Sequence, residues 1–278
     1  MKTTTNYLIL NQACSDLLIT IVEFISILLP FDHVGSLWFG GLFGLATCKI
    51  FEASAIIVPI FSIWVLVAIA IERFYAVNRL LKSSPMSQHL KKTILLLWAW
   101  SAVSSTEYFI YAKVIQIGEH YYCYVAIPRW FILGTALNTF LPLLIITALY
   151  IIVCHKLWLR KVPGEGATQN QGQGEAVKTA KKVTVMMITI VVLYVLCWIP
   201  LDVYIILVFW GYVEMNYSLF LFVSWLTVCF SGLNPYIYVA FSEKFRNGFK
   251  NLFRNCFRKI KLPNAIFLRS QSVELEQL

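Results

Sequence analysis

The chain has 278 residues, of which 59% are hydrophobic and only 13% are charged. Soluble domains are usually about 45–50% apolar and about 25% charged, so this composition excludes a disordered protein, a disulfide-stapled miniprotein and almost any soluble enzyme. The net charge of +9, from 23 Lys and Arg against 14 Asp and Glu, raises the question of which side of a membrane the cations occupy.

Six apolar stretches of the chain are long enough for membrane-spanning helices, which need roughly 20 residues each. All six are much longer than a typical strand, which favours helix over buried strand. The expected spans are residues 7–29, 48–74, 92–111, 130–157, 183–210 and 217–241. The sequence therefore predicts an all-α membrane protein with a transmembrane bundle over residues 1–241, followed by a cytoplasmic amphipathic helix and tail over residues 242–278.

The basic residues are distributed unevenly between the linkers. One side of the membrane would carry only Lys49, Lys113 and Arg129 of the 23 basic residues. Because Lys and Arg are enriched on the cytoplasmic side, the other side is expected to be cytoplasmic, and an even number of spans places both ends there. Residues 162–175 are rich in Gly and Gln and are expected to form a flexible cytoplasmic loop.

Acidic residues and prolines occur within or near the ends of the expected spans. The acidic residues are Asp16, Glu23, Glu52, Glu72, Glu107 and Asp202. An ionisable residue in a span is costly and normally faces the bundle interior, where it marks function; a buried structural hydrogen bond or an interfacial position is the alternative. The prolines that interrupt four spans are Pro59, Pro142, Pro200 and Pro235, and each removes a backbone hydrogen bond and permits a kink.

Short motifs follow one another along the chain in an order that is much more specific than any one of them. They are Asn11 with Asp16, Trp38-Phe39-Gly40, Cys48, Glu72-Arg73-Phe74, Trp98 with Ser101, Pro142 with Tyr150, Cys197-Trp198-Ile199-Pro200, Asn234-Pro235-Tyr236-Ile237-Tyr238, and Phe245-Arg246. In this order the chain resembles the rhodopsin-like (class A) family of G-protein-coupled receptors, and in particular a neuropeptide receptor.

The resemblance implies a seven-helix receptor bundle, a function as a ligand-activated receptor and no enzymatic activity. The chain has six spans, and parity predicts that the first transmembrane helix of the family is the one that is missing, before Met1. An incomplete gene prediction and a genuinely truncated product both remain open. The implied location is the plasma membrane, with several spans and a cytoplasmic C-terminus.

The resemblance also implies roles for individual residues. Those implied in activation and G-protein coupling are Glu72, Arg73, Leu81, Tyr150, Pro200, Pro235 and Tyr238. Those implied in binding a regulatory sodium ion are Asp16, Ser62, Ser231 and Asn234. A Cys48–Cys123 disulfide is expected on the outer side, which is oxidising. Asn216 is a candidate glycosylation site, and Cys256 is a candidate palmitoylation site.

Some positions depart from the family pattern. Leu80 stands where the second inner loop usually has Pro, Tyr108 where the fourth helix often has Pro, and Tyr194 where Phe is usual. The sixth helix begins at 178–182 with no acid that could hold Arg73 across the bundle, so restraint is expected from Glu72 or from elsewhere. No retinal is expected, because Val228 stands where opsins carry a Lys.

The ligand is expected to be cationic, because the outer half of the bundle collects acids. The expected ligand-binding residues are Glu23, Glu52, Ala55, Pro59, Trp198 and Asp202. A basic neuropeptide is favoured over a biogenic amine, since Ala55 stands where amine receptors carry an Asp. The alternative is that Glu23 and Glu52 face lipid headgroups or pair with Lys49.

The expected partners are an extracellular peptide or amine, a heterotrimeric G protein, arrestin and membrane lipids. In the tail, Phe residues recur at i, i+4 spacing among cations, which is typical of a helix on the anionic inner leaflet. A nucleic-acid partner fits the charge but not this aromatic stripe. A truncated non-signalling subunit that pairs with full receptors remains an alternative. A channel or carrier is not supported, because neither a Thr-Val-Gly-Tyr-Gly filter nor tandem repeats are present.

Overall fold

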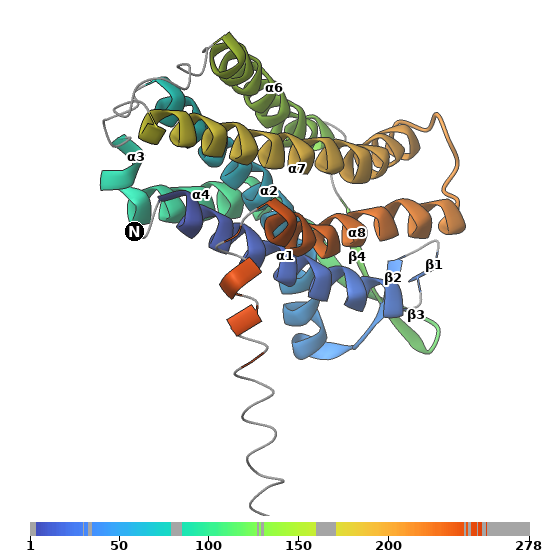
Figure 1. Ribbon diagram of the computed structural model, residues 1–278. Coiled ribbons are helices and arrows are strands. Elements are labelled where there is room, and N and C mark those ends of the chain that lie inside the picture. The colour runs from blue at the N-terminus through green and yellow to red at the C-terminus, as the bar shows by residue number, and fades with distance from the viewer. Residues whose placement is uncertain are drawn as a thin grey trace, which may run out of the picture. The chain divides into compact units, whose positions relative to one another are not determined.

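The computed structural model consists mainly of long helices, and it describes residues 4–29, 31–32, 35–78, 85–126, 128, 131–159, 171–241, 243, 246–248, 250–251 and 254. The chain divides into two compact units, Met1–Asn234 and Pro235–Leu278. The helices and strands in chain order are α1 Thr4–Leu28, β1 Phe31–Asp32, β2 Gly35–Trp38, α2 Gly41–Asn78, α3 Pro85–Gln88, α4 Leu90–Ser104, α5 Thr106–Tyr111, β3 Ala112–Ile117, β4 His120–Val125, α6 Phe131–Leu159, α7 Gln171–Phe209 and α8 Tyr217–Phe241 (Figure 1).

Five helices in the described part of the chain are long and apolar enough to cross a membrane: α1, α2, α6, α7 and α8. Large apolar side chains are exposed along them, among them Leu17, Leu144 and Leu196. Such a continuous apolar exterior is unfavourable in water and matches the hydrocarbon of a bilayer. The chain is therefore a multi-pass membrane protein.

Helix α2 forms the centre of the first unit. It packs against α1, α4, α5 and α6, and Phe61, Ile63, Val65 and Ile69 on it are almost completely buried. The aromatic ring of Phe61 stacks on Trp98 of α4, with ring centroids 3.9 Å apart. Helix α7 also contacts α2.

The third expected span, residues 92–111, is not one continuous helix but two, α4 and α5, separated at Ser105. The hydroxyls of Ser105 and Thr106 both donate to the backbone oxygen of Ala102, at 3.0 and 3.1 Å. Consecutive hydroxyl residues offer the backbone such alternatives to regular helical hydrogen bonds, and this accounts for the break.

Helix α7 begins at Gln171, twelve residues before the expected apolar span over 183–210. The prediction of a loop as far as residue 175 was therefore wrong at its end. The apolar pattern marks only the part of a helix that lies in lipid, whereas Gln, Glu, Ala and Lys continue a helix readily into water. The helix also continues through Pro200, as α2, α6 and α8 continue through their prolines.

The connections at one end of the bundle form an antiparallel sheet with the strand order β1-β2-β4-β3. Strands β3 and β4 form a hairpin in which Ile117 pairs with His120, so Gly118 and Glu119 make a two-residue turn. Gly118 has φ of +59°, a conformation that this kind of turn requires and that glycine adopts without strain. This hairpin was not expected from the sequence, although residues rich in Val, Ile and Tyr on both sides of a Gly-Glu turn are a hairpin signal.

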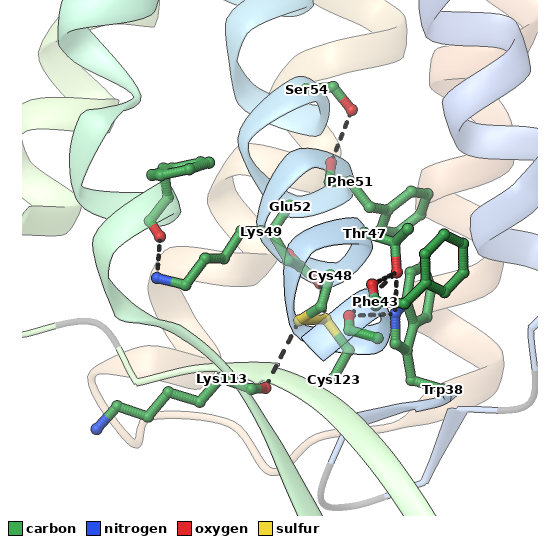
Figure 2. Close-up of a disulfide and its surroundings, with 12 residues drawn as sticks. Trp38, Phe43, Thr47, Cys48, Lys49, Phe51, Glu52, Ser54, Lys113 and Cys123 are labelled. Atoms are coloured by element: carbon green, nitrogen blue, oxygen red, sulfur yellow. Dashed lines mark hydrogen bonds between the residues drawn. A yellow bond between two sulfur atoms is a disulfide. The ribbon is translucent and has the colours of Figure 1, made fainter. Parts of the chain in front are cut away.

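The structure contains the expected Cys48–Cys123 disulfide, which joins α2 to β4. Strand β2 pairs with the same strand, with Ser36 opposite Cys123. At the end of β2, the Trp38 indole donates to the Gly44 backbone oxygen and to the Thr47 hydroxyl of α2, both at 3.0 Å (Figure 2). The connection between α1 and α2 and the hairpin are thus both anchored to the start of α2.

Candidate functional site

A cavity of about 280 Å³ lies among α1, α2, α5, α6, α7 and the first turns of α8. All six residues that the sequence analysis assigned to ligand binding line it: Glu23, Glu52, Ala55, Pro59, Trp198 and Asp202. The described residues that line the cavity include three acids and no Lys, Arg or His. Carboxylates that converge on one cleft with low-dielectric walls produce a negative potential that attracts cations.

The three acids come from three different helices. Glu23 lies on α1, Glu52 on α2 and Asp202 on α7. Glu52 lies one helical turn after Cys48 on α2, and its Oε1 is 3.7 Å from the Cys123 sulfur (Figure 2). Asp202 accepts a hydrogen bond from the Thr139 hydroxyl of α6, while its Oδ2 is buried with no hydrogen-bond partner in the described part of the chain. That oxygen can accept a donor from a ligand.

Lys49 is the basic residue nearest to this site in the sequence, but other groups bind it. Its Nζ donates to the backbone oxygens of Phe109 at 2.9 Å and Ile110 at 3.3 Å, and it lies 5.2 Å from the centre of the Phe109 ring. Figure 2 shows the side chain extending away from the disulfide towards one of these carbonyls. Cations bind favourably at helix C-termini, so the end of α5 holds the lysine.

Aromatic residues form another wall of the cavity. Tyr194 and Trp198, one turn apart on α7, stack with ring centroids 5.7 Å apart. Phe230 of α8 meets Tyr194 edge to face at 5.4 Å. The Trp198 indole nitrogen is buried without an acceptor among the described residues. A change at Trp198 would therefore be transmitted through close ring contacts to α8.

Several cavity residues were missed by the sequence analysis. Tyr108 lines the cavity, and its hydroxyl oxygen is 3.3 Å from that of Thr135, which lines it too. Asn138 and Thr139 on α6 also contribute. These residues carry no pattern that marks them, because polar residues at separate positions of α5 and α6 meet only through packing. Glu107, considered as a further acid, does not line the cavity.

A second polar cluster lies between α1, α2 and α8. Asp16 accepts from Asn234 Nδ2 through Oδ2, at 2.8 Å, and from Gln12 Nε2 through Oδ1, at 3.2 Å. Gln12 Nε2 also donates to the Ser62 hydroxyl. Ser231 is buried, and its hydroxyl has no partner in the described part of the chain. Asp16 and Asn234 are therefore in direct contact, and Gln12, which was not foreseen, joins Asp16 to Ser62.

At the opposite end of α2, Arg73 is bound by a residue that the sequence did not suggest. Its guanidinium donates to the hydroxyl of Thr5 on α1. Thr5 is 5% exposed, and Arg73 Nε is buried without a partner among the described residues. A small cavity beside Arg73 is lined by residues of α6 and α7, including Leu157 and Thr184. This arrangement supplies a restraint on Arg73 from α1.

The other assigned residues have varied surroundings. Tyr150 is buried in α6, and Pro235 and Tyr238 belong to the second unit. Asn216 lies just before α8, where its Oδ1 accepts from the Leu219 backbone N–H at 3.0 Å. This is an N-cap contact, so the side chain of the candidate glycosylation site has a structural role. Leu81, Cys256 and most of the expected tail helix lie outside the described residues.

Comparisons with known proteins agree with the motif order. A profile of the family described as "7 transmembrane receptor (rhodopsin family)" matches residues 1–238. The neuromedin-K receptor of Mus musculus is 31% identical over 266 residues, which cover 89% of this chain and 56% of that protein. The substance-P receptor of Rattus norvegicus is 27% identical over 268 residues, covering 89% of this chain and 62% of that protein. The chain therefore spans little more than half the length of the curated relatives it matches.

Proposed function

Because the chain belongs to the rhodopsin family of seven-transmembrane receptors, we propose that it acts as a receptor that binds a cationic peptide at the outer face of the plasma membrane and activates a heterotrimeric G protein at the inner face. Two relatives are named as receptors for neuromedin K and substance P, and these names support a peptide ligand. In this orientation the disulfide end faces outwards, and the C-terminus is cytoplasmic.

The observation that carries the proposal is the cavity with three acids and no basic residue among its described lining. Glu52 and Asp202 approach it from two different helices, α2 and α7. A Lys or Arg side chain or a free amine of the ligand would supply the donor that Asp202 Oδ2 lacks. A hydrogen bond of this kind to a charged group contributes about 1.5–3 kcal/mol.

The cavity also explains how binding could reach the inner face. A ligand that contacts Asp202 lies one helical turn from Trp198, which stacks on Tyr194. A ligand can shift a conformational equilibrium only through contacts that differ between the two states. The stacked rings of α7 and their contact with Phe230 are the contacts that we expect to differ, and release of Arg73 at the other end of α2 would expose the surface that binds the G protein.

The experiment is a screen of basic neuropeptides on cells that express the chain, with G-protein activation as the readout. For the most potent peptide, Asp202→Asn and Glu52→Gln each remove one negative charge with little change of volume. We expect each to lower potency by roughly tenfold or more, since about 1.4 kcal/mol corresponds to tenfold. Glu107→Gln is the matched control, because Glu107 is an acid of the same region that does not line the cavity. Unchanged potency in both cavity variants would contradict the acidic binding site.

A further inference from the structure

Gln12 holds the centre of the polar cluster between α1 and α2. It is completely buried, and its Nε2 donates both to Asp16 Oδ1, at 3.2 Å, and to the Ser62 hydroxyl oxygen. The other carboxylate oxygen of Asp16 accepts from Asn234 Nδ2 at 2.8 Å. Each oxygen of the carboxylate therefore has a donor that belongs to the chain itself.

The orientation of the Gln12 amide follows from the chemistry of its partners. In the structure the amide nitrogen of Gln12, which carries two N–H groups, faces Asp16 and Ser62. This orientation suits an ionised Asp16, because an ionised carboxylate only accepts hydrogen bonds. With the amide reversed, Gln12 Oε1 would face a carboxylate oxygen, and two acceptors would repel each other. The two N–H groups suit the two acceptors, one on Asp16 and one on Ser62.

This arrangement does not fit the sodium ion that the resemblance to the receptor family implies. A sodium ion at this site would need the oxygens of Asp16 and Ser62 as ligands, and hard cations of this kind bind oxygen atoms rather than N–H groups. Here the N–H groups of the Gln12 amide, whose hydrogens carry a partial positive charge, donate to Asp16 Oδ1 and to the Ser62 hydroxyl oxygen. We infer that the Gln12 amide replaces the sodium ion between Asp16 and Ser62, which makes the bundle insensitive to sodium.

Displacing Gln12 would separate a buried donor from a charged acceptor. A sodium ion that displaced Gln12 would have to break the hydrogen bond between the amide and Asp16. The cost of breaking a hydrogen bond to a charged group weakens sodium binding by at least about tenfold.

A second arrangement competes with this inference. The buried oxygens Gln12 Oε1, Ser231 Oγ and Asn234 Oδ1 have no hydrogen-bond partner in the described part of the chain, and a rotated Gln12 could turn its oxygen towards a cation.

The substitution Gln12→Leu separates these two arrangements. If the amide takes the place of the ion, its removal leaves Asp16 Oδ1 and Ser62 without a donor, and sodium gains a site. If Gln12 is instead a ligand of the ion, its removal weakens sodium binding. Asn11→Leu is the matched control, because Asn11 is the neighbouring amide on the same helix and donates to the backbone oxygen of Tyr7, outside the cluster.

The test measures the thermal unfolding of the purified full chain in lipid nanodiscs, in equal concentrations of sodium chloride or choline chloride. Anything that binds only the folded state raises its melting temperature. We expect the wild type and Asn11→Leu to melt at the same temperature in both salts. We expect Gln12→Leu to melt several degrees higher in sodium.

A sodium-dependent rise in the wild type that Asp16→Asn abolishes would overturn the inference, and this comparison holds even if Gln12→Leu does not fold. A folded Gln12→Leu variant with no response to sodium would also overturn it. The measurement needs neither a ligand nor a G protein, so its outcome is independent of the proposed receptor function.

Discussion

The contact between Arg73 and Thr5 gives a sharp prediction about basal activity. The sequence offers no acid at the start of the sixth helix to hold Arg73, and the structure places the Thr5 hydroxyl of α1 on its guanidinium. Thr5→Val keeps the shape of the side chain and removes only the acceptor. We expect this variant to raise G-protein activation in the absence of ligand, because the state in which Arg73 is held inside the bundle loses a stabilising contact.

The size of the effect follows from the contact that is lost. A hydrogen bond to a charged group contributes about 1.5–3 kcal/mol. Arg73 is only half-buried, so water replaces part of this contact, and the lower end of the range applies. Since about 1.4 kcal/mol is tenfold in an equilibrium constant, the balance between the held and released states should shift by about tenfold.

The assay is ligand-independent nucleotide exchange on G proteins, at matched surface expression. Thr20→Val is the control, because the Thr20 hydroxyl also lies on α1 but donates to the Asp16 backbone oxygen of its own helix, at 2.7 Å. Arg73→Ala should abolish signalling in either background. Basal activity of Thr5→Val equal to that of the wild type would refute the proposed role of Thr5.

Two predictions concern stability and are measured by thermal unfolding in nanodiscs. Cys123→Ser opens a ring that joins positions 75 residues apart. Chain entropy limits the loss of stability to about 4.5 kcal/mol, and the loss should be smaller than this limit because inserted helices already restrict the unfolded chain. The control Cys14→Ser, at an exposed free thiol, should melt like the wild type. Phe61→Ala empties a fully buried position where the ring stacks on an indole of α4, and it should lower the free energy of unfolding by about 3 kcal/mol or more. The control Phe24→Ala, at a position that is 60% exposed, should have little effect. Equal losses of stability in the two variants would contradict the packing argument.

The sequence alone predicted two kinds of feature: the helices that must be apolar because they lie in lipid, and the residues that share one face of a helix because of their spacing. A spanning helix must be apolar over its length, because lipid offers no partner to backbone groups, so the expected range 217–241 coincides with α8. The helical period places Glu52, Ala55 and Pro59 on one face of α2, and all three line the cavity. The ends of helices in water were less predictable, as the early start of α7 shows, because apolar length does not mark them.

Only the tertiary structure decided which side chains meet across the bundle. Gln12 contacts a serine 50 positions away and Arg73 a threonine 68 positions away, and neither pair follows from any period in the sequence. Such contacts depend on the rotation and axial shift of one helix against another, which are set by the packing of many side chains together. The sequence placed Asp16 in a polar cluster, and the packing of α1 against α2 decided that an amide of the chain lies beside it.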